Sequence, residues 1–134
     1  MTDDIKKKID VVFIAGGKFH DIDFARLEIL KLLAEDDRMK VRVFEDYSNL
    51  HAIEKADFLI TYTCDVRPTL EQQRVLKDYV SSGNRWLALH GTNSILQFMS
   101  DGKVDSPRIA PVMMETLGSQ FIAHPPIEPY KVKV

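Results

Sequence analysis

Several features that assign a chain to a protein class are scarce or missing here. There is one cysteine, Cys64, so an intrachain disulfide is impossible and a reducing, cytoplasmic setting is expected. No apolar run approaches the ~20 residues that span a bilayer, and none forms a signal-peptide core. Lys and Arg number 18 against 20 Asp and Glu, a net charge of -2. We therefore expect neither nucleic acid nor a membrane as partner.

The remaining composition is that of an ordinary globular domain. The chain has 134 residues, of which 45% are hydrophobic and 28% charged. This length suits one domain with a real core. We expect residues 1–134 to form that single domain.

Apolar, β-branched segments alternate with amphipathic ones along the chain. The main segments predict strands at 9–15, 41–44, 58–63 and 85–89, the last of them central in the sheet, with short strands at 121–123 and 130–134. The alternation with helices predicts an α/β fold, a three-layer, doubly wound and mainly parallel sheet.

The helix signals differ in detail. Asp23 is a plausible N-cap for a first helix, and residues 49–55 form a short helix or turn. Thr69-Leu70-Glu71-Gln72 is a capping-box pattern, and Gly83 ends that helix. Ser106-Pro107 predicts the start of a further helix that Gly118 closes. The predicted apolar faces are Phe24, Leu27, Leu30, Leu33 and Ala34 for the first helix, Leu76, Tyr79 and Val80 for the second, and Ile109, Val112, Met113 and Leu117 for the last.

Three of the four histidines follow predicted strands. Ligands of parallel sheets bind at the carboxyl ends of the strands, where His20, His90 and His124 are expected. Imidazole serves as general acid, general base or metal ligand. We predict His90 and then His20 as catalytic residues, and all three as possible ligands of a divalent metal such as zinc. The alternative for each is a structural hydrogen bond.

Other polar or small residues of these loops complete the predicted site. We expect five of them to contact a ligand: Gly17, Asp21, Thr63, Asn93 and His124. The glycine pair 16–17 is not a full dinucleotide fingerprint, and a tight turn is its simpler interpretation. Gly91 is expected to permit a sharp turn that aims His90. Cys64 is expected to be a buried structural thiol, since no helix begins close enough to activate it.

Three segments together carry a family resemblance. Phe19-His20-Asp21 after a glycine pair, Trp86 to Asn93, and Leu117 to Pro125 resemble motifs of ThuA-like (trehalose-utilisation) proteins, in the same order. The resemblance implies a flavodoxin-like or class I glutamine amidotransferase-like fold. His90 stands at the corner where the amidotransferases carry their cysteine, which argues against glutamine hydrolysis. The family domain continues further, so we expect this chain to be truncated at its C-terminus.

The resemblance implies a role in carbohydrate utilisation, on trehalose or a related glycoside. We expect a small carbohydrate ligand, histidine acid/base or metal-assisted chemistry, and a homodimer formed through helix faces. Two alternatives stay open. One is a non-catalytic sugar-binding or assembly module of the same fold, and the other is a hydrolase that uses Cys64.

Overall fold

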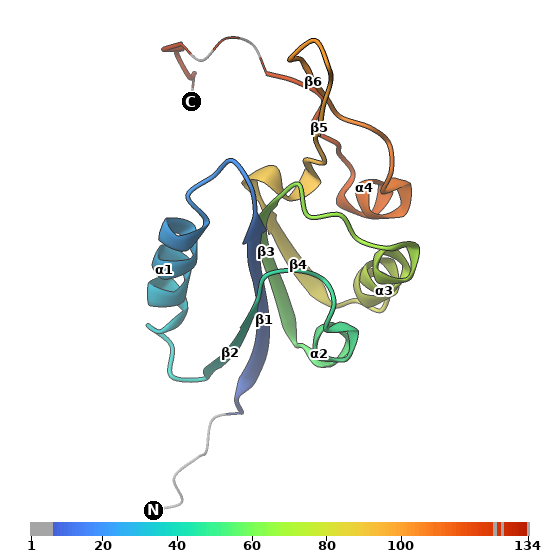
Figure 1. Cartoon of the computed structure of the whole chain (residues 1–134). Coiled ribbons are helices and arrows are strands. Elements are labelled where there is room, and N and C mark those ends of the chain that lie inside the picture. The colour runs from blue at the N-terminus through green and yellow to red at the C-terminus, as the bar shows by residue number, and fades with distance from the viewer. Residues whose placement is uncertain (1–6, 125, 127, 134) are drawn as a thin grey trace, which may run out of the picture.

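Four parallel strands form the centre of the molecule (Figure 1). The computed structural model describes residues 7–124, 126 and 128–133. The strands β1 (Ile9–Gly17), β2 (Met39–Phe44), β3 (Phe58–Cys64) and β4 (Arg85–Leu89) lie in the order β2-β1-β3-β4. Val12 is in register with both Arg42 and Leu59, and Ile60 with Leu87. The predicted parallel pairing is confirmed, but β4 lies at the edge and not in the centre.

Helices cover both faces of this sheet. The helix α1 (Ile22–Leu33) packs on one face, and α2 (Leu50–Lys55), α3 (Leu70–Ser81) and α4 (Pro111–Leu117) lie on the other (Figure 1). Because successive side chains of a strand point to opposite faces, Val11 and Phe13 of β1 belong to the core under α1, and Val12 and Ile14 to the other core. All four are completely buried. The chain is thus an α/β protein with a parallel sheet between helical layers.

The first helix begins earlier than predicted. Asp21, and not Asp23, is its N-cap, and the Asp21 carboxylate accepts a hydrogen bond of 2.9 Å from the backbone N–H of Phe24. Two residues of the predicted apolar face are on the outside, Phe24 at 62% and Leu27 at 52% exposed. The predicted Leu30 and Leu33 do pack on the sheet, together with Ile22 and Ile29, which the prediction left out.

The last helix begins later than predicted. Pro111, not Pro107, occupies its first turn, and Ile109 lies outside it and is exposed. No side chain of its own caps α4. The buried Gln73 of α3 does so across the interface, because its Oε1 accepts from the N–H of Val112 at 3.2 Å. A tertiary contact thus fixes the start of this helix.

Other local signals are confirmed. The capping box of Thr69 and Gln72 is present at the start of α3. Leu76 and Tyr79 are buried on its inner face. Gly118 ends α4 in the left-handed conformation, with φ 73°. Such caps depend on residues within one turn of each other, which explains why the sequence revealed them.

The part of the chain that follows β4 departs most from prediction. The 3₁₀ helix η1 (His90–Asn93) follows β4 directly, and then a small antiparallel hairpin forms from β5 (Gln97–Phe98) and β6 (Val104–Asp105). Residues 121–123 form no strand, and neither do residues 130–133, whose Tyr130 is 85% exposed. Pro125 and Val134, which end two predicted segments, lie outside the described residues.

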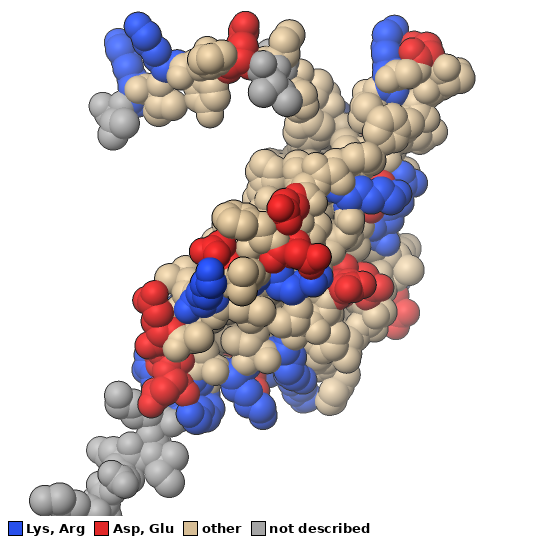
Figure 2. Space-filling view, turned by 60° about the vertical axis from the view of Figure 1, so that its left-hand side comes forward, with Lys and Arg blue, Asp and Glu red and all other residues tan. Residues whose placement is uncertain are grey.

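The surface is of mixed charge. On the face that Figure 2 shows, acidic and basic side chains lie close to one another. Within the described part of the chain, none of the helices is long and apolar enough to cross a membrane.

Candidate functional site

A cleft of about 680 Å³ opens at the carboxyl ends of β1, β3 and β4. Its walls come from the loop after β1, from η1, from the hairpin and from the segment after α4. The residues that line it are Phe19, His20, Cys64, His90, Gly91, Asn93, Ser94, Leu96, Phe98, Val104, Phe121, Ile122, Ala123 and His124. None of these is Lys, Arg, Asp or Glu. The cleft is therefore largely apolar, with three imidazoles and one amide as its main polar groups.

Two predicted catalytic histidines meet in this cleft. The ring centres of His20 and His90 are 4.4 Å apart, in an edge-to-face arrangement at 65°. His90 also stacks on Tyr62 of β3, with ring centres 5.7 Å apart and planes inclined by 11°. The prediction that His90 follows its strand in a cleft shared with His20 is confirmed.

The environment of His20 favours its neutral form. Partial burial in the cleft lowers the pKa of His20, and the neighbouring His90 lowers it further, because a second positive charge so close is unfavourable. A neutral imidazole at neutral pH has a free lone pair. His20 is therefore suited to accept a proton.

Unusual backbone conformations cluster at the same edge of the sheet. Phe19, Asp65 and His90 have φ of 68°, 57° and 48°, and they follow β1, β3 and β4 respectively. A side chain in this left-handed region costs roughly 1–2 kcal/mol. Residues held in such conformations concentrate at functional sites. The strained turn at the corner falls on His90 itself and not on Gly91, contrary to the prediction.

The glycines of the site are needed for close packing. A Cβ on Gly17 would lie 1.9 Å from the carbonyl oxygen of Cys64, and one on Gly91 would lie 2.8 Å from that of Thr63. Gly17 does not line the cleft, so its predicted ligand contact is not supported. Both glycines allow neighbouring strand ends to approach each other closely.

Two further predicted ligand contacts have structural roles. Asp21 caps α1, as described above. Thr63 is 2% exposed, and its hydroxyl is hydrogen-bonded at 3.3 Å to the buried hydroxyl of Tyr47. Neither lines the cleft.

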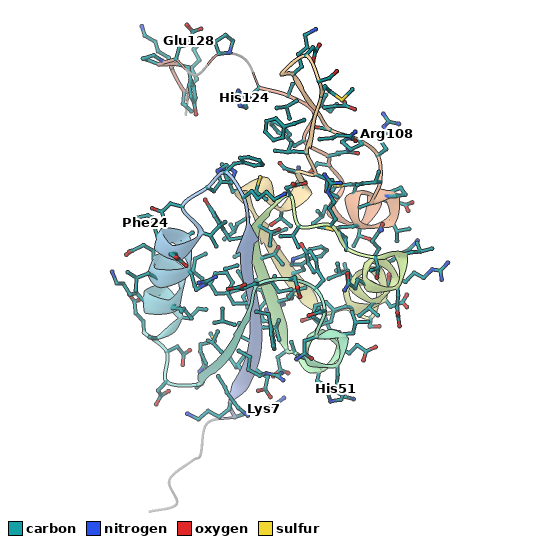
Figure 3. The ribbon with its side chains drawn as sticks, viewed as in Figure 1. Lys7, Phe24, His51, Arg108, His124 and Glu128 are labelled. Carbon is teal, nitrogen blue, oxygen red and sulfur yellow. The ribbon has the colours of Figure 1, made fainter. Side chains whose placement is uncertain are left out.

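Asn93 and His124 do line the cleft. The Asn93 side-chain amide donates to Ser119 Oγ at 2.9 Å, and the backbone carbonyl of Asn93 accepts from the N–H of Phe121 at 3.1 Å. These two bonds join η1 to the segment after α4. His124 lies on that segment, with its ring 6.1 Å from that of Phe121. In Figure 3, His51 lies at the opposite end of the molecule from His124, and it is exposed.

The three histidines do not assemble into a metal site. Within residues 7–124, 126 and 128–133, no group of three or more His, Cys, Asp or Glu side chains is placed to hold a metal ion. Structural zinc needs four ligands, and catalytic zinc typically three from the protein. His20 and His90 alone do not meet this requirement.

Cys64 has the surroundings of a structural thiol. It is 2% exposed, and burial raises its pKa, with the charge of Asp65 adding to this effect. A raised pKa leaves little of the reactive thiolate.

The residues that sequence reasoning missed are Asp65, Phe19 and Phe98. The rings of Phe19 and Phe98 are 5.3 Å apart at the mouth of the cleft.

The sequence placed Phe19 and Asp65 in strand-end loops, which was the available signal for them, whereas Phe98 comes from the hairpin that no signal predicted.

No family model, curated protein or solved structure matches this chain, so the site is interpreted from its own geometry.

Proposed function

We propose that the cleft binds a small uncharged carbohydrate and that His20 and His90 transfer protons on it. The observation that carries the proposal is the contact of these two rings, 4.4 Å apart, inside a cleft of about 680 Å³. The ThuA-like resemblance and the strand order β2-β1-β3-β4, which suits a flavodoxin-like or amidotransferase-like sheet, support it.

The lining favours an uncharged ligand. None of the lining residues is Lys or Arg, so the lining itself offers no such partner to an anionic substrate such as a sugar phosphate. Phe19, Phe98 and Phe121 offer ring faces for the apolar side of a sugar ring. Asn93 and the three imidazoles of the lining offer hydrogen bonds to its hydroxyls. Binding pockets usually combine an apolar wall with a few such polar groups.

The chemistry follows from the two imidazoles. His20, with its lowered pKa, accepts a proton from a hydroxyl or from a carbon next to a carbonyl. His90, held by the stacked ring of Tyr62, is placed to donate or relay a proton on the same ligand. General acid/base catalysis of this kind contributes roughly 10²–10⁴-fold to a rate. The donor set does not suit a metal, so no step is routed through one.

The proposal is tested by titrating the protein with neutral sugars, trehalose first, and with a sugar phosphate as the charged comparison. NMR signals of the His20 and His90 rings should shift with a neutral sugar only. His90→Ala should abolish turnover and leave the fold intact, while His51→Ala serves as the matched control. A stable His90→Ala protein with undiminished turnover would overturn the catalytic assignment, and absence of any sugar-dependent shift would overturn the ligand class.

A second candidate function, an assembly module, is favoured by the exposed edge of β4. Within the described residues, no strand pairs with its outer side. The opposite edge strand, β2, carries Lys40 and Arg42, which discourage edge-to-edge pairing. β4 has only Arg85 at its start, and its Leu87 is 44% exposed. An apolar edge of this kind favours the addition of another strand.

The occupant that this edge suits best is a second copy of the chain, paired antiparallel about Leu87. Trp86 of one copy would then lie opposite the small Ala88 of the other, and Arg85 opposite Leu89, so that no like charges face each other. Sedimentation should give a dimer mass, and Leu87→Lys should give a monomer because two lysines then meet at the axis. Val43→Lys on β2 is the control. A monomer mass for the unaltered chain over a wide concentration range would refute this candidate.

A further inference from the structure

Asp65 joins the chain segments that wall the cleft. It follows β3, and its side chain is only 4% exposed. Its carboxylate accepts from Lys18 Nζ at 3.1 Å, from Arg67 Nε at 3.2 Å and from the N–H of Leu96 at 3.0 Å. Its own N–H donates to the carbonyl of Ser94 at 2.9 Å. One residue thus bonds to the loop after β1, the loop after β3 and the segment after η1.

Three of these four links, those to Lys18, Ser94 and Leu96, end at or beside a lining residue. Lys18 directly precedes Phe19 and His20, and its backbone N–H donates to the carbonyl of Cys64 at 2.9 Å. Ser94 and Leu96 line the cleft themselves and follow the 3₁₀ turn that begins at His90. The two histidines therefore sit on segments that are connected through Asp65.

A second bridge strengthens the same junction. The guanidinium of Arg67 bonds to the Asp65 carboxylate and also donates to the carbonyl of Leu96 at 2.5 Å. Leu96 is thus held through both its N–H and its carbonyl. Hydrogen bonds to ionised groups are among the stronger ones in proteins.

The carboxylate of Asp65 is held in its charged form. Burial alone would raise its pKa, but the hydrogen bonds from Leu96, Lys18 and Arg67, together with the charge of Arg67, outweigh burial and lower the pKa. Lys18 and Arg67 together bring two positive charges to this one negative charge, which leaves the three-residue cluster with a net charge of +1. The left-handed backbone of Asp65, with φ 57°, is a further sign that the surrounding contacts determine its conformation.

We propose that Asp65 is the positioning residue that sets the spacing of His20 and His90. The link to Lys18 holds the loop of His20, and the links to Ser94 and Leu96 hold the segment that continues from His90. Asp65 does not line the cleft. The inference deepens the proposed histidine site, but it rests on the geometry of the pair and not on the identity of the sugar.

The test is a double-mutant cycle read by NMR titration of the His20 ring. In the unaltered protein, His90→Gln should raise the pKa of His20 toward its ordinary value of about 6.5, because the neighbouring charge is removed. In Asp65→Asn, the pKa of His20 should already be higher, and adding His90→Gln should change it little. A residue with only a stabilising role would leave this coupling in place.

Two further variants complete the design. Asp101→Asn is the matched control, because Asp101 also pairs with a lysine, Lys103 at 3.1 Å, and accepts from that residue's N–H, but in the hairpin turn. It should leave the coupling unchanged. Lys18→Met cuts only the link to the His20 loop and keeps the bond of Asp65 to Leu96, which guards against a misfolded Asp65→Asn. In Lys18→Met, the effect of His90→Gln on the pKa of His20 should also be smaller.

The inference is overturned if His90→Gln shifts the pKa of His20 as much in both Asp65→Asn and Lys18→Met as in the unaltered protein. It is also overturned if His90→Gln does not change the pKa of His20 in the otherwise unaltered protein. Failure to bind any sugar would overturn the proposed function and leave these titrations unaffected.

Discussion

Gly91→Ala probes the packing of the candidate site more directly than any other substitution. Gly91 is buried and directly follows His90, and its backbone does not adopt the left-handed conformation. An added Cβ would lie 2.8 Å from the carbonyl oxygen of Thr63, 3.1 Å from Cys64 Cβ and 3.3 Å from His20 Nε2. The first two neighbours belong to β3 and are fixed by the sheet. The ring of His20 is the neighbour that can move.

The magnitude follows from two opposing effects. Overpacking of this kind costs about 1–3 kcal/mol. Alanine also lowers the conformational entropy of the unfolded chain, which offsets about 0.4–1 kcal/mol of this cost. We therefore expect a net loss of about 1–2 kcal/mol in the free energy of unfolding, together with displacement of the His20 ring from His90.

Urea unfolding followed by the fluorescence of Trp86, the single tryptophan, measures the first effect. The NMR signals of the His20 ring measure the second. Gly102→Ala is the comparison, since no atom lies within 4 Å of its added Cβ and only its backbone, with φ 81°, is strained. It should lose stability without moving His20. A Gly91→Ala protein with full stability and unchanged His20 signals would refute the packing argument.

Three further predictions concern single residues. His90→Gly should be more stable than His90→Ala by about 0.5–1 kcal/mol, since φ 48° suits glycine; thermal unfolding in the reverse order would contradict this. Because the folded pKa of His20 is lowered, the unfolded chain binds the proton more readily, so stability should fall as pH drops below about 6.5. His20→Gln should flatten this slope in urea titrations, and His51→Gln should not. Gln73→Met, which uncaps α4, should cost about 1–3 kcal/mol in urea unfolding, while the exposed Arg74→Met should cost nothing measurable.

Local sequence signals predicted the elements whose formation depends on near neighbours. The two inner strands, β1 and β3, were evident because a segment buried on both faces is nearly continuously apolar. The start of α3 was evident because Thr69 and Gln72 cap each other within one turn. The start of α1 was not, since Asp21 and Asp23 both suit an N-cap. Packing on the sheet decided between them, and it left Phe24 outside.

The same division holds for the candidate site. The sequence determined that His20 and His90 follow parallel strands, and the geometry of such sheets brings those ends to one edge. Only the tertiary structure decided that these two rings touch and that His124 joins no metal-binding group with them. The tertiary structure also buried the side chain of Thr63 in the core. Side-chain direction and the spacing between loops are set by contacts such as that of Asp65 with Lys18, 47 positions apart in the chain, and no local pattern encodes them.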